Sequence, residues 1–216
     1  MTPQDASRRM RELCSLAPVV PVLVIDDISH ARPLAAALVA GGLPVLEVTL
    51  RTPVALQAIR EMALVPGAVV GAGTVLGARD VAAARAAGAR FAVSPGATPA
   101  LLAACEAEDM PILPGAATAS EVMTLLDRGY DMAKFFPADA IGGAPALRAL
   151  GGPLPQMAFC PTGGIGADTA AEYLALPNVI CVGGSWIAPK GLVHRKDWRA
   201  IQSLAQAAKD LQPAGK

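Results

Sequence analysis

Residues 132–138 of the chain read Met-Ala-Lys-Phe-Phe-Pro-Ala. Gly129 precedes this run and Pro137 lies near its end, and the run is apolar on both alternating faces except for Lys134. A short apolar run of this kind, bounded by glycine and proline, predicts a strand that is buried on both sides. Such strands belong to parallel sheets covered by helices, so this stretch predicts an α/β fold.

The same unit repeats along the chain. Apolar runs rich in Val, Ile and Leu alternate with alanine-rich segments of helical period, and glycines follow several of these segments. The expected strands are residues 19–25, 44–50, 68–75, 91–95, 111–115, 132–137, 158–163 and 179–184. The expected helices are residues 31–40, 53–63, 78–87, 98–107, 118–128, 144–150, 167–176 and 197–209, preceded by one amphipathic helix at residues 4–16.

Alternating strands and helices predict a parallel sheet. Eight such units in 216 residues predict a closed (β/α)8 TIM barrel with an extra N-terminal helix. Because no linker of Pro, Ser or charged residues separates two halves, we expect residues 1–216 to form a single (β/α)8 barrel domain. An open flavodoxin-like sheet is the alternative, but it needs only about five or six strands.

The composition argues against several classes of function. Hydrophobic residues make up 53% of the chain and charged residues 17%, which is typical of a globule with a heavily buried sheet. Lys and Arg number 18, as do Asp and Glu, so there is no basic field for nucleic acid or an anionic membrane. An aromatic content of 4% argues against a base-stacking surface.

The start of the chain is polar and lacks the apolar core of a signal peptide, and runs such as residues 19–25 are too short to span a bilayer. The two histidines, His30 and His194, stand apart, so we expect solvated surface residues and no metal-ligand cluster. Scattered cysteines without a C-x-x-C pair are typical of small buried side chains in a reducing compartment. These cysteines are Cys14, Cys105, Cys160 and Cys181. We therefore expect a cytoplasmic protein with no metal and no cofactor.

Lys134 is the one charged residue in its predicted strand. Burying an ammonium without a partner is costly, so such a group tends to lose its proton instead. A lysine that is neutral at physiological pH is an amine nucleophile, which Schiff-base chemistry requires. Most lysines in strands extend to water or form structural ion pairs, and this stretch by itself favours that alternative.

Glu47 and Arg51 have the same parity along the second predicted strand. Burial of Glu47 among Val45, Leu46 and Val48 would raise its pKa, which suits a group that both accepts and donates protons. A purely structural Glu47–Lys134 ion pair is the alternative, although apolar replacements of buried pairs are often as stable. Arg51 could bind a carboxylate with its guanidinium or lie on the surface.

In (β/α)8 barrels, chemistry occurs at the carboxyl ends of the strands, and most of the predicted ends carry polar or glycine-rich groups. These groups are Thr74, Ser94-Pro95-Gly96, Lys134 with Phe136, Pro161-Thr162-Gly163-Gly164 and Gly183-Gly184-Ser185. The last two follow the seventh and eighth strands, where such barrels commonly bind phosphate with backbone N–H groups and a helix N-terminus. Either glycine turn alone would indicate only a loop.

Seven stretches together carry a family resemblance, and they occur in family order between residues 15 and 190. They are Val19–Val22, Leu46–Thr52, Val70–Val75, Ser94–Gly96, Lys134–Ala138, Phe159–Ile165 and Gly183–Trp186. With them the chain resembles the bacterial 2-keto-3-deoxy-6-phosphogluconate (KDPG) aldolases, which also act as 4-hydroxy-2-oxoglutarate (KHG) aldolases. The resemblance implies a cytoplasmic homotrimer of (β/α)8 barrels that serves the Entner–Doudoroff route and cleaves a phosphorylated keto acid without a metal.

The resemblance also implies residue roles. Lys134 is similar to the Schiff-base lysine of the family and Glu47 to its proton-transferring base. Arg51 and Thr74 are expected to hold the pyruvyl carboxylate. The other expected substrate contacts are Pro95 and Phe136 along the pocket wall, and Thr162, Gly163, Gly164 and Ser185 near the phosphate.

Under this hypothesis, the Lys134 amine attacks the C2 ketone, Glu47 removes the C4 hydroxyl proton, and C3–C4 cleavage releases glyceraldehyde 3-phosphate and then pyruvate. Three alternatives stay open. A metal-dependent pyruvate aldolase is disfavoured because no acidic ligand set occurs at the strand ends. A sugar-phosphate isomerase or synthase could use Lys134 and Glu47 as acid and base. A non-catalytic binding protein would have no reason to bury both of them.

Overall fold

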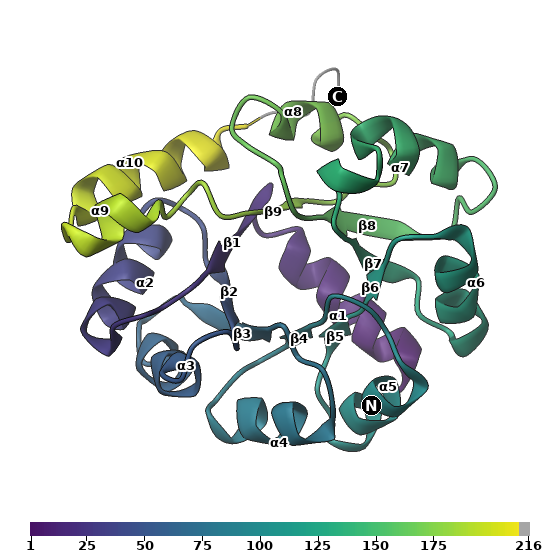
Figure 1. The fold of residues 1–216 in the computed structure, drawn as a ribbon, viewed down its shortest axis with the longest axis horizontal. Coiled ribbons are helices and arrows are strands. Elements are labelled where there is room, and N and C mark those ends of the chain that lie inside the picture. Colours follow the sequence, from purple (N-terminus) through teal and green to yellow (C-terminus); the bar gives the residue numbers. More distant parts are fainter. Residues whose placement is uncertain (212–216) are drawn as a thin grey trace.

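The computed structural model describes residues 1–211 of the chain, and a curled sheet of parallel strands lies at its centre (Figure 1). The strands are β1 (Val19–Leu23), β2 (Val45–Thr49), β3 (Val69–Gly73), β4 (Ala92–Val93), β5 (Ile112–Leu113), β6 (Gly115–Ala116), β7 (Met132–Phe135), β8 (Ala158–Pro161) and β9 (Val182–Gly184). All paired strands run parallel, which confirms the predicted α/β class.

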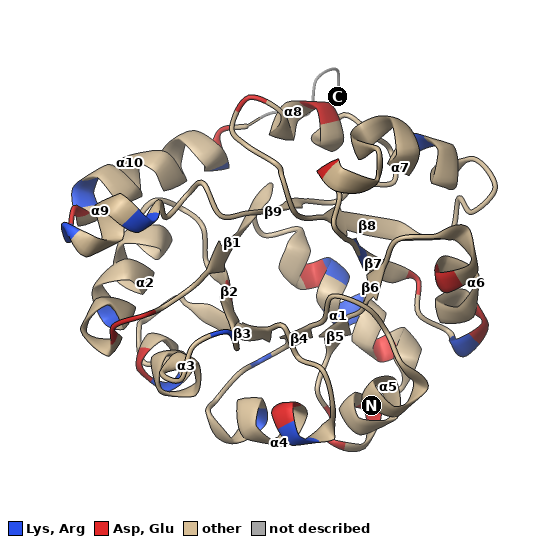
Figure 2. Cartoon of the chain, in the orientation of Figure 1, with Lys and Arg blue, Asp and Glu red and all other residues tan. Residues whose placement is uncertain are grey.

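Helices cover the sheet, most of them on its outer side and α1 across one end (Figure 1). They are α1 (Pro3–Cys14), α2 (Ala31–Ala40), α3 (Ala55–Ala63), α4 (Ala78–Ala86), α5 (Pro99–Ala107), α6 (Ala119–Arg128), α7 (Gly143–Gly151), α8 (Ala170–Leu174), α9 (Lys190–His194) and α10 (Trp198–Lys209). Two 3-10 turns, η1 (Ile28–His30) and η2 (Asp139–Ile141), join strands to helices. Basic and acidic residues are interspersed over the outer helices, consistent with the balanced charge (Figure 2).

The strands pair as two ladders, in the orders β5-β4-β3-β2-β1-β9 and β6-β7-β8. Pro114 alone separates β5 from β6. A proline has no N–H for the ladder, so the expected strand 111–115 is interrupted there. The Pro114 carbonyl nevertheless accepts a hydrogen bond from the Lys134 N–H at 2.8 Å. Two isolated bridges, Phe159 to Val179 and Thr162 to Gly183, connect the β8 side to the β9 side.

Helix α1 lies across one end of the curled sheet (Figure 1). Its side chains Met10, Leu13 and Cys14 pack with a group of inward-facing strand residues. That group is Val20, Val45, Phe91, Val93, Leu113, Met132, Ala158, Cys160 and Cys181. Because this end is filled with apolar atoms, polar chemistry is left to the opposite end, where the strands finish.

Local signals explain where several outer helices begin and end. The Thr98 side chain accepts a hydrogen bond from the N–H of Leu101, and Pro99 occupies the first turn of α5. Thr118 and Glu121 form a reciprocal capping box at α6. Helix α6 ends at Gly129, whose φ of 99° is in the left-handed region that favours glycine. These contacts fix the helices that return the chain to the sheet.

Two sequence-based expectations are corrected. Helix 167–176 is much shorter, because α8 covers only Ala170–Leu174 and a turn over Gly166–Thr169 precedes it. His30 is not a solvated surface residue: it is 7% exposed, and its ring packs edge-on against Trp198 of the distant helix α10. Within residues 1–211, no helix is both long and apolar enough to cross a membrane.

The four cysteines are free and buried, as expected. Three of them are not scattered in space, however. Cys14 of α1, Cys160 of β8 and Cys181 beside β9 belong to the same interior cluster. Apolar strand residues surround them, and the sulfur of Cys160 also lies 4.0 Å from Thr162 Oγ1, so they form part of the floor beneath the strand ends.

Candidate active site

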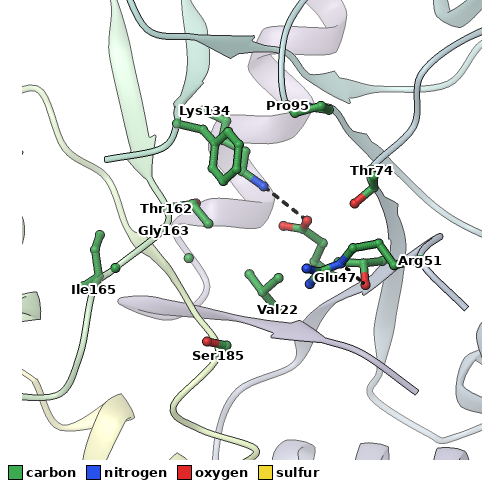
Figure 3. Close-up of a pocket in the computed structure, with 14 residues that line it drawn as sticks. Val22, Glu47, Arg51, Thr74, Pro95, Lys134, Thr162, Gly163, Ile165 and Ser185 are labelled. Carbon is green, nitrogen blue, oxygen red and sulfur yellow. Dashed lines mark hydrogen bonds and ion pairs between the residues drawn. The ribbon is translucent and has the colours of Figure 1, made fainter. Parts of the chain in front are cut away.

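A cavity of about 310 Å³ opens at the carboxyl ends of the strands, on the side of the sheet opposite α1 (Figure 3). All ten site residues expected from the sequence line it. They are Glu47, Arg51, Thr74, Pro95, Lys134, Phe136, Thr162, Gly163, Gly164 and Ser185. The cavity therefore gathers side chains from the ends of six strands or the loops that follow them, although their functional roles stay predictions.

Lys134 and Glu47 meet at the bottom of this cavity (Figure 3). The Lys134 Nζ lies 3.3 Å from Glu47 Oε1, and the two side chains are 7% and 4% exposed. Burial raises the pKa of the Glu47 carboxyl, and the charge of Lys134 opposes that rise. The buried lysine is thus paired rather than isolated, and its amine is 5.2 Å from the centre of the Phe136 ring.

Gly73 of β3 makes room for the Glu47 carboxylate. The register pairs Glu47 with Gly71 and Thr49 with Gly73 on the neighbouring strand. A Cβ atom added at Gly73 would come within 2.2 Å of Glu47 Oε1, far inside contact distance. The position of the carboxylate therefore favours glycine at residue 73, whereas at Gly71 the ring of Phe91 takes up the space.

Arg51 is held by Thr49, which is outside the predicted set of site residues. Its Nε donates a hydrogen bond to Thr49 Oγ1 at 3.2 Å, and Thr49 Oγ1 in turn donates to the Leu23 carbonyl at 2.9 Å. Thr49 is 1% exposed, so its hydroxyl is fixed between β1 and the arginine. This chain of hydrogen bonds directs the guanidinium over the cavity (Figure 3).

Thr74 faces Arg51 across the mouth of the cavity (Figure 3). Its φ of 61° lies in the left-handed region, which β-branched residues seldom adopt. Strain of this type persists only where the surroundings impose it, and it is concentrated at functional sites. A hydroxyl and a guanidinium converging from two strand ends can together hold a carboxylate.

The other end of the cavity is formed by the turn after β8 and by Ser185. Gly163 and Gly164 have φ values of 101° and 79°, so the backbone itself requires glycine there. Within residues 1–211, the N–H groups of Gly164 and Ile165 donate no hydrogen bond to the protein. These donors and the Ser185 hydroxyl can bind an anion. The five-residue helix α8 begins too late in the chain to supply its N-terminus.

Four lining residues were absent from the sequence-based set: Val22, Thr49, Ile165 and Gly183. Val22 and Thr49 have strand parities that face the interior, so alternation could have indicated both. A Cβ at Gly183 would lie 2.3 Å from Thr162 Oγ1, which shows that this glycine gives the threonine its space. Nothing in the sequence around Ile165, apart from its position after the glycine turn, indicated that it lines the cavity.

The arrangement is suited to imine chemistry on a keto acid. It offers a buried amine, an adjacent carboxyl group with a raised pKa, a cationic end that could hold a carboxylate, and a glycine turn at the other end that could bind an anion. Within residues 1–211, no group of three or more His, Cys, Asp or Glu side chains is placed to hold a metal ion. The expectation of a metal-free, cofactor-free reaction stays a prediction.

Comparison with known proteins also points to imine chemistry on a keto acid. The family model described as KDPG and KHG aldolase matches residues 10–204. The 2-dehydro-3-deoxy-phosphogluconate aldolase of Pseudoalteromonas atlantica is 53% identical over 199 residues, which are 92% of this chain and 93% of that protein.

Two solved structures are also similar. The KDPG aldolase of Zymomonas mobilis, crystallised with 3-phosphoglycerate, superposes with a TM-score of 0.93 at 52% identity, covering 96% of this chain and 98% of that one. The KDPG aldolase of Legionella pneumophila, with pyruvate captured as a covalent carbinolamine intermediate, has a TM-score of 0.90 at 48% identity and covers 93% and 98%.

Proposed function

The chain belongs to the KDPG and KHG aldolase family, and on this premise we propose that it is a Schiff-base aldolase whose nucleophile is Lys134. It cleaves 2-dehydro-3-deoxy-6-phosphogluconate to pyruvate and glyceraldehyde 3-phosphate, and it acts on 4-hydroxy-2-oxoglutarate to give pyruvate and glyoxylate. The observation that carries the assignment of the nucleophile is the buried Lys134–Glu47 pair at the bottom of the cavity.

The first steps use both members of this pair. The Lys134 amine attacks the C2 ketone, and loss of water from the carbinolamine gives an iminium ion. Glu47 then removes the proton of the C4 hydroxyl, directly or through a water molecule. The C3–C4 bond breaks, its electrons enter the iminium to give an enamine, and the aldehyde leaves. Glu47 has a raised pKa because it is buried, so it can return the proton to C3 before water releases pyruvate.

The two ends of the cavity orient the substrate around that bond. Arg51 and Thr74 hold the carboxylate next to C2, with Pro95 and Phe136 along the wall. Thr162 directly precedes the glycine turn, on the side of the cavity that takes the phosphate end of the substrate. Gly163, Gly164 and Ser185 hold the phosphate of the longer substrate. Binding both ends places C2 against the Lys134 amine.

We also infer the finer architecture and setting. The two strand ladders, joined through Pro114 and through the β8–β9 bridges, are consistent with one closed (β/α)8 barrel, and α1 is then the extra helix at its amino-terminal end. A single domain over residues 1–216 remains a prediction from the lack of a linker, and a cytoplasmic location one from the composition and the resemblance. A homotrimeric assembly and a place in the Entner–Doudoroff route remain predictions from the resemblance. Residues 212–216 lie outside the described part of the chain.

Borohydride trapping tests the nucleophile. Pyruvate and borohydride together should inactivate the enzyme, and mass spectrometry should place the reduced adduct on the peptide containing Met132–Ala138. Lys134→Arg keeps the charge beside Glu47 but cannot form the imine, so it should fold and lose roughly 10³-fold or more in turnover. Lys190→Arg changes an exposed lysine that does not line the catalytic cavity, and it should keep activity and trapping.

The outcomes separate the alternatives. An isomerase, a synthase or a metal-dependent aldolase would show no reduced pyruvate at Lys134. A binding protein would show no turnover of the sugar acid at all. Substantial activity in Lys134→Arg, or an adduct on another lysine, would overturn the assignment of the nucleophile.

A further inference from the structure

A second cavity adjoins the active site and is not used by the reaction described above. It measures about 420 Å³ and lies between the segment that follows β1 and helix α9. It shares two lining residues, Val22 and Ser185, with the catalytic cavity. Ser185 lies at one edge of the catalytic cavity, away from Arg51 and Thr74, and Val22 lies between Ser185 and Glu47 (Figure 3). The second cavity therefore begins where the phosphate end of the first one finishes.

The walls of this cavity include a buried imidazole. The side chain of His30 is 8% exposed and packs against Trp198 at 5.9 Å between ring centroids. The His194 ring lies 6.3 Å from it, also in the cavity wall. Within residues 1–211, the His30 ring makes no hydrogen bond to the protein, and its charged neighbour Asp27 is 3.9 Å away. Within the described residues no fully buried side-chain nitrogen or oxygen lacks a partner, so the unbonded nitrogens of His30 must reach open space, and a ligand in the cavity that His30 lines could bind them.

An ion pair stands at the same cavity. Lys190 Nζ lies 2.9 Å from Asp26 Oδ2, and this contact holds the pKa of Asp26 below its ordinary value. Because the ammonium is already neutralised by a carboxylate, the cavity has no surplus positive charge for an anion. Its remaining wall is apolar, formed by residues such as Ile25, Ala188 and Pro189. Interleaved donors, acceptors and apolar atoms suit a chain of hydroxyl groups better than a charged group.

We propose that this second cavity is an acceptor subsite, which holds the distal hydroxyl groups of unphosphorylated aldoses that are longer than glyceraldehyde. The inference rests on the proposed aldolase function, run in the direction of addition. The enamine carbon of the pyruvate adduct on Lys134 attacks the aldehyde carbon, and a new C–C bond forms. The aldehyde oxygen takes a proton to become a hydroxyl, and water releases a longer 2-keto-3-deoxy sugar acid. The step needs no oxidant or reductant.

The position of Ser185 explains why the two kinds of acceptor would differ. A phosphorylated three-carbon acceptor ends in the anion-binding turn beside Ser185, so it has no need of the second cavity. A longer chain without phosphate passes Ser185 and meets His30, His194 and the Lys190–Asp26 pair. The second cavity should therefore recognise the length and the hydroxyl groups of the acceptor, and the first cavity should recognise its phosphate.

Filling the second cavity tests the proposal. Ala188→Phe places a ring in it without changing any residue of the catalytic cavity. With pyruvate as the donor, kcat/KM should fall roughly 10-fold or more for D-ribose and change less than about 2-fold for D-glyceraldehyde and glyceraldehyde 3-phosphate. The matched control is Ala97→Phe in the separate groove between α5 and α6, which should leave the ribose-to-glyceraldehyde ratio unchanged.

A second pair of variants tests the polar wall. Lys190→Met should lower kcat/KM for D-ribose about 3- to 10-fold, the effect of one hydrogen bond, whereas Lys196→Met, which is outside the cavity, should not. Pyruvate trapping by borohydride in each variant reports the fold and the Schiff base independently. Wild-type enzyme that traps pyruvate but does not add it to D-ribose would overturn the subsite alone. So would equal losses for all three acceptors, or a loss confined to glyceraldehyde 3-phosphate.

Discussion

Lys134 and Glu47 are both removed from water, and stability gives little reason for this. Less than a tenth of either side chain is exposed, and their closest N–O distance is 3.3 Å. The desolvation of two charges usually offsets the attraction between them, and apolar residues of similar volume are often as stable. Proton transfer gives a better reason, because burial raises the pKa of Glu47 and brings its proton exchange nearer to neutral pH.

Glu47→Gln should separate binding from proton transfer. The amide keeps the shape but accepts no proton, so turnover should fall about 10²- to 10⁴-fold while pyruvate is still trapped on Lys134. The wild-type rate should rise with pH as Glu47 loses its proton, with a midpoint above the ordinary glutamate value of 4.5 because the pKa is raised. That acid limb should be missing in the variant. Near-wild-type exchange of pyruvate methyl protons with deuterium in Glu47→Gln would remove Glu47 from its role.

Thr49 offers a second test at the scale of one hydroxyl. Thr49→Val keeps the volume but removes the acceptor for Arg51 Nε and the donor to the Leu23 carbonyl. Since a hydrogen bond contributes about 0.5–1.5 kcal/mol, KM for the keto acid should rise roughly 2- to 10-fold with kcat within about 2-fold. Thr49→Ser should restore KM. A fall in kcat with an unchanged KM would mean that Thr49 does not act through carboxylate binding.

At the scale of elements, one polar cluster ties α5, α6 and the start of β7 together. Glu106 of α5 accepts hydrogen bonds from Arg128 Nε and Nη2 at 2.8 and 3.0 Å and from the Tyr130 hydroxyl at 3.1 Å. The Arg128 contact is the largest influence and holds the pKa of Glu106 below its ordinary value; burial opposes it, and the Tyr130 contact lowers the pKa by a smaller amount. The cluster thus steadies the helix that precedes the Lys134 strand.

Glu106→Gln should reveal this tie through its pH dependence. A carboxyl whose pKa is lowered by folding stabilises the folded state above its ordinary pKa of 4.5, and this contribution is lost as pH falls through the lowered value. At pH 7 the free energy of unfolding, measured with urea, should be about 1–2 kcal/mol lower in the variant. The loss is modest because the side chains of Arg128 and Glu106 are each a quarter or more exposed. The deficit should shrink well below pH 4.5. A deficit that is constant with pH would show that packing, not charge, is lost.

The sequence predicted most elements because their signals are local. Period-two parity aligned Glu47 with Arg51, and the alternation of apolar runs with alanine-rich segments marked strands and helices. Contacts between distant segments were not visible. The burial of His30 depends on packing against Trp198, which lies far away in the sequence. The shortness of α8 follows from a turn in which Thr169 Oγ1 accepts a hydrogen bond from the Gly166 N–H.

The site followed the same rule. Residues at strand ends could be predicted, because parallel strands finish at one edge of the sheet and the expected residues indeed surround one cavity. The supporting contacts could not. The hydrogen bond from Arg51 to Thr49 depends on one rotamer, and the role of Gly73 depends on where a neighbouring carboxylate lies. Such details arise only after the strands are in register.

At the scale of the whole molecule, the two ends of the curled sheet have different tasks. One end is closed by apolar side chains of α1, including Leu13 at 3% exposure, and the other carries the catalytic cavity. The interior between them is packed with side chains of several strands. A substitution at the α1 end should therefore change stability and leave catalysis nearly unchanged. A substitution at the end with the catalytic cavity should do the reverse.

Two single substitutions test this division. Leu13→Ala removes buried methyl groups, so the free energy of unfolding should fall about 2–5 kcal/mol while kcat/KM stays within about 2-fold under folding conditions.

Ser185→Ala removes one hydrogen bond to a charged group, worth about 1.5–3 kcal/mol, so kcat/KM for the phosphorylated substrate should fall roughly 10- to 200-fold with stability unchanged. The unphosphorylated analogue should lose much less. Equal losses for both substrates would show that Ser185 does not bind phosphate, and a raised KM in Leu13→Ala would show that the α1 end shapes the catalytic cavity after all.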